Sequence, residues 1–222
     1  MKRIGIVAAL PGEIRPLVRG WKHGHDVFQG RIGEFEAVAA CAGMGAAAVT
    51  GACESLLAAG KLDALVSIGW AGSLSCGLQA GQAYAVREVI DTASGERFMT
   101  DSAKGQRLIT LDHVADAKEK RSLGISHQAV MVDMEAATVA RLARAKKLGF
   151  DCFKAITDGP NDKLPDFNAF TGPTGQLRMP TLIGWALVHP QHWGALRRLG
   201  SSSREAAVAL SNLVHGFFAG SQ

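Results

Sequence analysis

The chain has 222 residues, of which 47% are hydrophobic, so it can bury a substantial core, and we expect one domain over residues 1–222. Its net charge is +4, only 6% of its residues are aromatic and no block of Lys or Arg occurs, which argues against a nucleic-acid-binding surface. No run reaches the roughly 18 apolar residues that a membrane span needs, which excludes an integral membrane segment.

Apolar runs rich in Val, Ile and Ala recur along the chain, and most end in glycine or turn residues. Near-continuous apolar runs are typical of strands that are covered on both faces. We therefore predict strands at 3–10, 35–43, 64–72, 83–90, 128–134 and 152–157. The first run is short and is soon followed by Glu13, so it predicts a strand rather than a targeting segment.

Helical patterns lie between these runs, at 46–60 and 135–149, with Gly149 as the expected stop of the second. Two more helices are predicted at 180–200, interrupted near Pro190, and at 203–218. The polar stretch 91–127 has no clear pattern. The alternation predicts an α/β fold in which a central mixed, mainly parallel β-sheet is flanked by helices.

The cysteines and histidines show no metal-ligand spacing. Cys41, Cys53, Cys76 and Cys152 form neither a Cys-x-x-Cys pair nor a cluster with histidine. We expect them to be reduced core thiols of a cytoplasmic protein, without disulfides or a metal site.

Acidic and glycine residues lie at or just after the ends of four of the predicted strands. They are Glu13, the segment 69–72, the pair Asp133 and Glu135, and Asp158. Ligands of α/β folds gather at the carboxyl ends of strands, so this coincidence predicts a binding site.

Each of these residues also has an ordinary explanation. Asp133 and Glu135 can cap a helix and interact with its dipole. Alternatively, the two oxygens of Glu135 suit the vicinal diol of a sugar, and Met134 suits its apolar face.

Asp158 precedes Gly159-Pro160 and can simply start a turn. As a general acid it would need a pKa raised by partial burial, and Thr157 could orient its carboxyl group. Glu13 can be a dipole-favoured helix residue or a base that deprotonates water. The glycine segments 41–47 and 67–77 permit close backbone approach to a ligand, but neither is a complete dinucleotide or Walker motif.

Taken together and in this order, these motifs resemble the purine nucleoside phosphorylase and nucleosidase superfamily, over about residues 3–162. The nearest pattern is that of 5'-methylthioadenosine/S-adenosylhomocysteine nucleosidase. The motifs that carry the resemblance are RIGIVAALPGEI, GMGAAAV, LVSIGWAGSL, MVDMEAATVARLA and FKAITDGPND.

The resemblance implies a nucleoside phosphorylase fold and a role for each matching residue. Glu135 would bind the ribose 2'- and 3'-hydroxyls, Asp158 would protonate purine N7, and Glu13 would activate the attacking water. The other residues implied to bind substrate are Met134, Asp133, Thr157, Trp70, Ala71, Gly72, His113 and Val114. Asp133 matches a position that is usually Glu, and Trp70 stands where the nucleosidases have a small hydroxyl residue. His113 and Val114 would flank the base, although the family's Gly-Asp-aromatic pattern is missing there.

Beyond residue 162 the chain resembles the hopanoid-biosynthesis-associated phosphorylases, whose implied substrate is adenosylhopane. Phe167, Phe170, Leu177 and Trp185 would line a groove for a large apolar 5' group, or would be ordinary core or a subunit interface.

The resemblance therefore implies an enzyme that cleaves a 5'-substituted adenosine, a small-molecule nucleoside, without a cofactor. We favour phosphorolysis, with phosphate as co-substrate and Arg15, Lys154 and Arg87 as its partners. The alternatives are a hydrolytic nucleosidase and a nucleoside-binding protein without catalysis. A dinucleotide-binding oxidoreductase lacks its glycine fingerprint. Sites of this family often borrow a residue from a neighbour, which implies a homodimer or a higher homo-oligomer.

Overall fold

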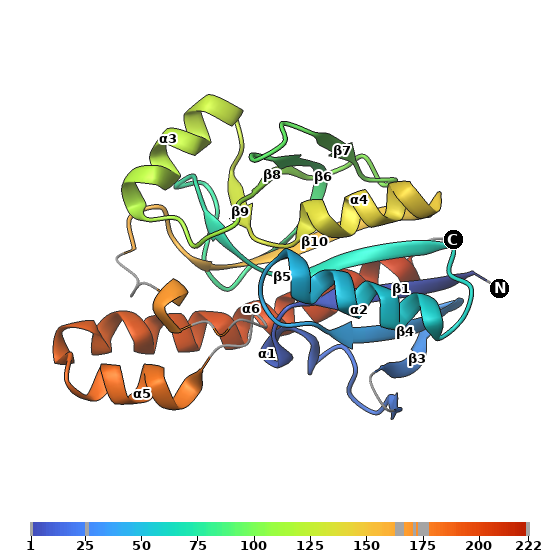
Figure 1. Cartoon of the computed structure of the whole chain (residues 1–222), viewed down its shortest axis with the longest axis horizontal. Helices are drawn as coiled ribbons and strands as arrows, with labels where there is room; N and C mark the ends of the chain where they lie inside the picture. The colour runs from blue at the N-terminus through green and yellow to red at the C-terminus, as the bar shows by residue number, and fades with distance from the viewer. Residues whose placement is uncertain (1, 25–26, 163–166, 171, 173–177, 221–222) are drawn as a thin grey trace.

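The structure is a computed structural model that describes residues 2–24, 27–162, 167–170, 172 and 178–220. Strands and helices alternate along most of its length (Figure 1). The strands are β1 (Arg3–Ala8), β2 (Lys22–His23), β3 (Phe28–Ile32), β4 (Phe35–Cys41), β5 (Ala64–Ser73), β6 (Ala83–Asp91), β7 (Arg97–Met99), β8 (Gln106–Thr110), β9 (Met131–Asp133) and β10 (Gly149–Asp158). The helices are α1 (Pro11–Ile14), α2 (Ala46–Ala58), α3 (Ala117–His127), α4 (Ala136–Lys146), α5 (Met179–Leu187) and α6 (Trp193–Ala219), with 3-10 turns η1 (Phe167–Phe170) and η2 (Pro190–His192).

Four long strands at the centre of the sheet run parallel, in the order β4, β1, β5, β10. The first residues of β5 pair with β1, whereas its last residues, Gly72 and Ser73, pair with β9. The sheet continues through β8 and β6, and β6 returns to β10. Because β10 also pairs with β5, this half of the sheet closes on itself. The carboxyl ends of β1, β5, β9 and β10 consequently lie close to one another.

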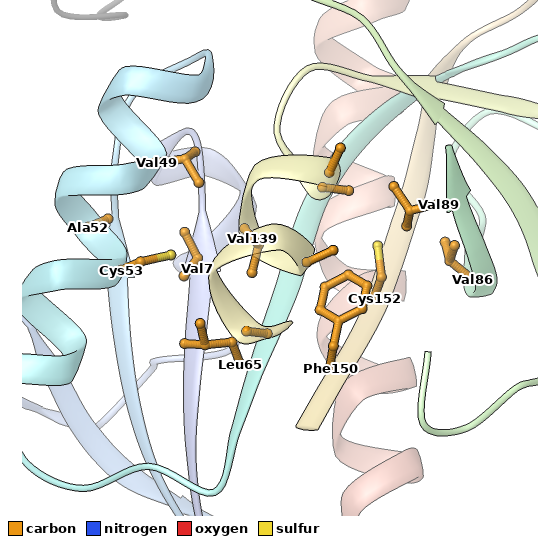
Figure 2. Packing of buried hydrophobic residues seen from close by; sticks show 14 of the residues in the cluster. Val7, Val49, Ala52, Cys53, Leu65, Val86, Val89, Val139, Phe150 and Cys152 are labelled. Carbon is orange, nitrogen blue, oxygen red and sulfur yellow. The ribbon is translucent and has the colours of Figure 1, made fainter. Parts of the chain in front are cut away.

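Helices cover the sheet on two sides. On one side α2 and α4 pack on the strands, so that Val49 and Cys53 of α2 and Val139 of α4 meet Val7 and Leu65 (Figure 2). On the other side the apolar face of α6 packs on β10, β6 and β5 through residues that include Ala206, Leu210, Val214 and Phe218. The prediction of an α/β fold with a mixed, mainly parallel sheet flanked by helices is confirmed.

The predicted elements differ from the observed ones at several places. The helix predicted at 135–149 ends at Lys146 because Lys147 adopts a left-handed backbone (φ 55°), and Gly149 already begins β10. The two C-terminal helices divide at Pro190, and α6 then runs without a break through Gly200. The stretch 91–127, which had no assignment, contains β7, β8 and α3.

All four cysteines are free thiols. Cys53 and Cys152 are buried, and burial raises the pKa of each thiol to about 12. Cys41 is only partly buried and Cys76 is exposed, so the prediction that all four lie in the core is wrong for these two.

Candidate functional site

A cavity of about 210 Å³ lies where the carboxyl ends of the strands meet. All eleven residues that the sequence nominated border it: Glu13, Trp70, Ala71, Gly72, His113, Val114, Asp133, Met134, Glu135, Thr157 and Asp158. Strand ends that converge in space thus gather motifs that are far apart in the chain.

Glu13 is buried in the short helix α1, directly after β1. Its Oε2 accepts hydrogen bonds from the backbone amides of Ala9 and Leu10, each at 2.8 Å, and its Oε1 accepts one from Trp70 at 2.9 Å. Gly69, with φ +154°, makes this possible, because a Cβ there would lie 3.1 Å from both carboxylate oxygens. Burial raises the pKa of Glu13, although the three amides and Lys154 favour its charged form. A base with a raised pKa is better matched to proton transfer near neutral pH.

Glu135 occupies the position just before α4 and is also buried. Its Oε1 accepts a hydrogen bond from the amide of Gly45 at 2.9 Å, and its Oε2 accepts one from Met134 at 3.2 Å. An amide of the glycine turn before α2 therefore donates to a carboxylate of the protein itself. Burial, together with the charge of Asp133, raises the pKa of Glu135 to about 7. Each oxygen keeps a lone pair for a ligand hydroxyl.

Asp133 is fully occupied by protein partners. It accepts hydrogen bonds from the Thr110 hydroxyl at 2.7 Å and the Ala136 amide at 3.0 Å, and Lys154 Nζ lies 2.8 Å from its Oδ2. Its side chain has no exposed surface, so in this structure its carboxylate is bonded to groups of the protein. Burial alone would lower the pKa of Lys154, but Asp133, Cys152 and Glu135 together outweigh this and raise it. The ammonium of Lys154 acts electrostatically on Glu135 and Glu13, where it favours the charged carboxylates.

Asp158 ends β10 at a β-bulge, where the register against β5 shifts between Ile156 and Asp158. Bulges of this kind turn side chains toward active sites. Thr157 donates a hydrogen bond to Asp158 Oδ1 at 2.8 Å, which is the orienting contact that the sequence predicted. The other oxygen, Oδ2, forms an ion pair with Lys120 Nζ.

Lys120 is a site residue that sequence reasoning missed. Helix α3, all of whose residues are described, buries only this side chain. Its ammonium contacts Asp158 and also donates to the Gly159 carbonyl at 3.1 Å. A Cβ on Gly72 would lie 3.1 Å from both Asp158 Oδ2 and Lys120 Nζ, so glycine makes room for the pair. We expected Asp158 to be a neutral acid, whereas the structure pairs its carboxyl group with Lys120.

His113 and Val114 border the cavity from the loop that precedes α3. The His113 ring bonds to Asp112 at 2.7 Å and to Glu119 at 3.0 Å, and these hydrogen bonds raise its pKa. Both ring nitrogens are therefore engaged, and a base would meet the face or edge of the ring.

Trp70 separates this cavity from a second one of about 1180 Å³, which lies between α1, α5 and α6. The two cavities share Ala9, Leu10, Trp70, Leu199 and Ser203. Among the buried polar side-chain atoms described, only Trp70 Nε1 lacks a hydrogen-bond partner. The second cavity is lined mainly by apolar residues, which include Pro11, Pro16, Leu182, Ala186, Leu196 and Val208.

The residues nominated for phosphate are not assembled into one site. Lys154 is committed to Asp133, and Arg87 is exposed on β6 and borders neither cavity. Arg15 is exposed and borders the second cavity, as does Arg204.

Four residues were nominated for an apolar groove, and the structure describes the side chains of two of them, Phe170 and Trp185. Phe170 is buried against the Trp185 ring, with centroids 5.5 Å apart, which favours a packing role. Leu177 and the side chain of Phe167 lie outside the described residues.

Within the described part of the chain, no three His, Cys, Asp or Glu side chains are placed to hold a metal ion. The described helices include none with the length and apolar character to cross a membrane.

Similar proteins were found by structure and by family, whereas the comparison with curated proteins gave no match. The S-adenosylhomocysteine nucleosidase of Streptococcus pyogenes, in complex with 5-methylthiotubericidin, superposes with a TM-score of 0.73 at 16% identity, covering 100% of this chain and 98% of that one. The 5'-methylthioadenosine/S-adenosyl homocysteine nucleosidase of Helicobacter pylori gives 0.71 at 17% identity, with 96% of each chain covered. Futalosine hydrolase of Helicobacter pylori gives 0.69 at 16%, covering 96% of this chain and 95% of that one.

At such identities these structures establish the fold, which is that of the nucleoside phosphorylases and nucleosidases. The family is shown by sequence, because a profile described as the phosphorylase superfamily matches residues 3–116, just over half of the chain. The chain therefore belongs to the phosphorylase superfamily, whose phosphorylases and nucleosidases are enzymes that need no cofactor.

Proposed function

We propose that this protein hydrolyses the N-glycosidic bond of a 5'-substituted adenosine. The observation that carries the proposal is the arrangement around one cavity of two buried carboxylates with raised pKa values, Glu13 and Glu135, and the Lys120–Asp158 ion pair. The two carboxylates suit a ribose that becomes positively charged during the reaction. The ion pair suits a purine base that leaves with the electron pair of the glycosidic bond.

The sugar is held by Glu135 in this mechanism. Its carboxylate accepts hydrogen bonds from the ribose 2'- and 3'-hydroxyls while Met134 packs on the ring. As the bond to the base lengthens, positive charge grows on the ribose, and preorganised carboxylates stabilise it. The Asp133–Lys154 pair keeps this wall from holding an excess of negative charge.

The base leaves through the Lys120–Asp158 pair. The electron pair of the glycosidic bond moves into the purine, and N7 gains a proton from the Lys120 ammonium by way of Asp158 Oδ2. Lys120 is then neutral and recovers a proton from solvent. General-acid help of this kind is typically worth ~10²–10⁴-fold in rate.

Glu13 supplies the nucleophile by removing a proton from water. Water is favoured over phosphate because four carboxylates border the cavity, and its bordering cations, Lys120 and His113, are paired with carboxylates. A phosphate dianion would lack a free positive partner among the described residues that border this cavity.

Phosphorolysis is the second candidate, and one observation favours it. Arg15 and Arg204 border the adjoining cavity beside Gly12, whereas Glu13 borders the first cavity, across Trp70. An anion held there could approach the ribose from the side of Trp70.

The second cavity supports a large apolar 5' group. It adjoins the proposed ribose site, and its volume of about 1180 Å³ exceeds what a methylthio group needs. An adenosine with a lipid-like 5' substituent, of which adenosylhopane in hopanoid biosynthesis is the example that the resemblance implies, fits this lining. We further propose that the enzyme acts in the cytoplasm as a homodimer or higher homo-oligomer, as the resemblance implies.

The test is release of adenine from 5'-methylthioadenosine and from an adenosine with a long apolar 5' chain, with and without phosphate, followed by identification of the sugar. We expect release without phosphate and a free reducing sugar, with faster turnover of the long-chain substrate. A sugar 1-phosphate formed only when phosphate is present would establish the second candidate instead. If neither substrate releases adenine, the proposed reaction is wrong.

A further inference from the structure

Residues 178–205 form a helical hairpin that extends beyond the sheet. It consists of α5, η2 and the first half of α6, and Figure 1 shows it projecting away from the body of the molecule. The buried residues of α6 all lie from Ala206 onward. The preceding part of the helix, residues 193–205, therefore projects over roughly 18 Å, at 1.5 Å per residue.

The tip of the hairpin is held in a defined shape. Trp185 stacks on His189, with ring centroids 4.3 Å apart, and also contacts His192. Trp193 Nε1 donates a hydrogen bond to the Ala186 carbonyl at 2.7 Å and so joins α6 to the end of α5. A tip braced in this way presents its side chains without further ordering.

The tip exposes large apolar side chains. Leu187 is 69% exposed, Val188 is 72% exposed and Trp193 is 54% exposed, and all three lie at or beside the turn. Neighbouring exposed apolar residues of this size mark an interaction site rather than ordinary surface.

The hairpin is also basic. Residues 178–205 contain Arg178, Arg197, Arg198 and Arg204 and one acidic residue, Glu205, a formal charge of +3 out of the net +4 of the whole chain. Arg197 follows Trp193 by four residues, which puts both on one face of α6.

We propose that this hairpin docks on the surface of an anionic lipid bilayer. Leu187, Val188 and Trp193 enter the interface, where tryptophan is favoured, and Arg197, one turn along α6 from Trp193, contacts lipid phosphates. A nucleic acid would match the charge but would leave Leu187 and Val188 in water. A second copy of the chain would match the apolar tip but would bring a +3 hairpin against a like charge unless it met another face.

Docking would also place the large cavity beside the bilayer. Leu182, Ala186 and Leu196 of the hairpin border that cavity, which adjoins the nucleoside site at Trp70. This consequence, though not the docking itself, rests on the proposed function.

The experiment is co-sedimentation of the full chain with vesicles of phosphatidylcholine, alone and mixed with phosphatidylglycerol, at low and high salt. We expect binding to the mixed vesicles that weakens with salt. Val188→Asp should lower the partition coefficient by about tenfold or more, because a charge replaces an inserted side chain. Arg197→Gln should lower it about fivefold. Met99→Asp is the matched control, since Met99 is 60% exposed on β7, outside the hairpin, and should leave binding unchanged.

Thermal melts of the variants check that each is folded, and Val188→Asp should keep the activity of the parent on a substrate free in solution. Equal binding to the neutral vesicles, or unchanged binding by Val188→Asp, would overturn the proposal. Sedimentation velocity without lipid tests the alternative that the tip joins two copies of the chain. If Val188→Asp dissociates an oligomer, the tip is an interface between copies and lipid docking is wrong.

Discussion

At the scale of single residues, Glu135 shows what burial does to a carboxylate that we propose binds a sugar. Desolvation and the neighbouring Asp133 raise its pKa to about 7, while Gly45 and Lys154 act in the opposite direction. The charged form is the one that accepts two hydroxyl hydrogen bonds. The proposed role of this residue therefore makes activity depend on pH near neutrality.

We predict that kcat/KM rises with pH until the solution passes about 7 and then levels off, because Glu135 must lose its proton. The free energy of unfolding should change in the opposite sense. The folded carboxyl binds a proton more tightly than the unfolded one, whose pKa is near 4.5, so this group's contribution falls by ~3 kcal/mol between pH 4.5 and 7. Rate profiles and urea titrations of the wild type and Glu135→Gln would measure both, and an unchanged profile in the variant would remove Glu135 from the account.

Lys120 gives the second prediction at this scale. Lys120→Met should lower the rate of adenine release by ~10²–10⁴-fold, because the leaving base loses its proton source. Lys120→Arg, which keeps the charge next to Asp158, should retain more of the rate. The discriminating substrate is a 4-nitrophenyl riboside with the same 5' group, whose leaving group needs no proton. If Lys120→Met slows this substrate as much as the nucleoside, Lys120 has only a structural role.

At the scale of elements, β5 and β10 determine where the site lies. The bulge at the end of β10 and the absence of a side chain at Gly72 let the Lys120–Asp158 pair lie against β5. The strand core, by contrast, depends on ordinary apolar packing.

Gly72→Ala tests the part of β5 that positions the Lys120–Asp158 pair. The new Cβ would lie 3.1 Å from Asp158 Oδ2 and Lys120 Nζ, so the pair must shift. We expect a loss of at least ~10-fold in kcat, since small displacements of catalytic groups are costly, and a loss of ~1–3 kcal/mol in stability. Gly51→Ala is the control, because Gly51 lies in α2 with open space around its Cα and alanine there should add ~0.5–1 kcal/mol. Full activity of Gly72→Ala would contradict the assigned geometry.

The elements that sequence predicted well are those with a strong apolar pattern. The runs at 3–10, 35–43 and 64–72 became β1, β4 and β5, because both faces of these strands are covered. β2, β3 and β7 were missed because they are short and lie toward the sheet edges, where exposed residues alternate with others. The break expected in α6 near Gly200 is absent.

At the scale of the whole molecule, the site is a product of topology. The sequence nominated eleven residues from strand-end positions and a family resemblance, and the fold brings all of them to one cavity. The sequence could not reveal which groups these residues bond to. Lys120 and Asp158 are 38 positions apart, Glu13 and Trp70 are 57 apart, and Gly45 and Glu135 are 90 apart, so no local pattern signals these contacts.

The central claim is that the carboxylates of this cavity cleave a nucleoside. The most direct measurement is chromatographic detection of adenine released in phosphate-free buffer by the wild type, by Glu135→Gln and by Glu36→Gln, a matched change at an exposed position on β4. The account predicts release by the wild type and by Glu36→Gln, and a rate at least ~100-fold lower for Glu135→Gln, the scale of losing one charge-stabilising group. Equal rates for the wild type and Glu135→Gln would contradict it.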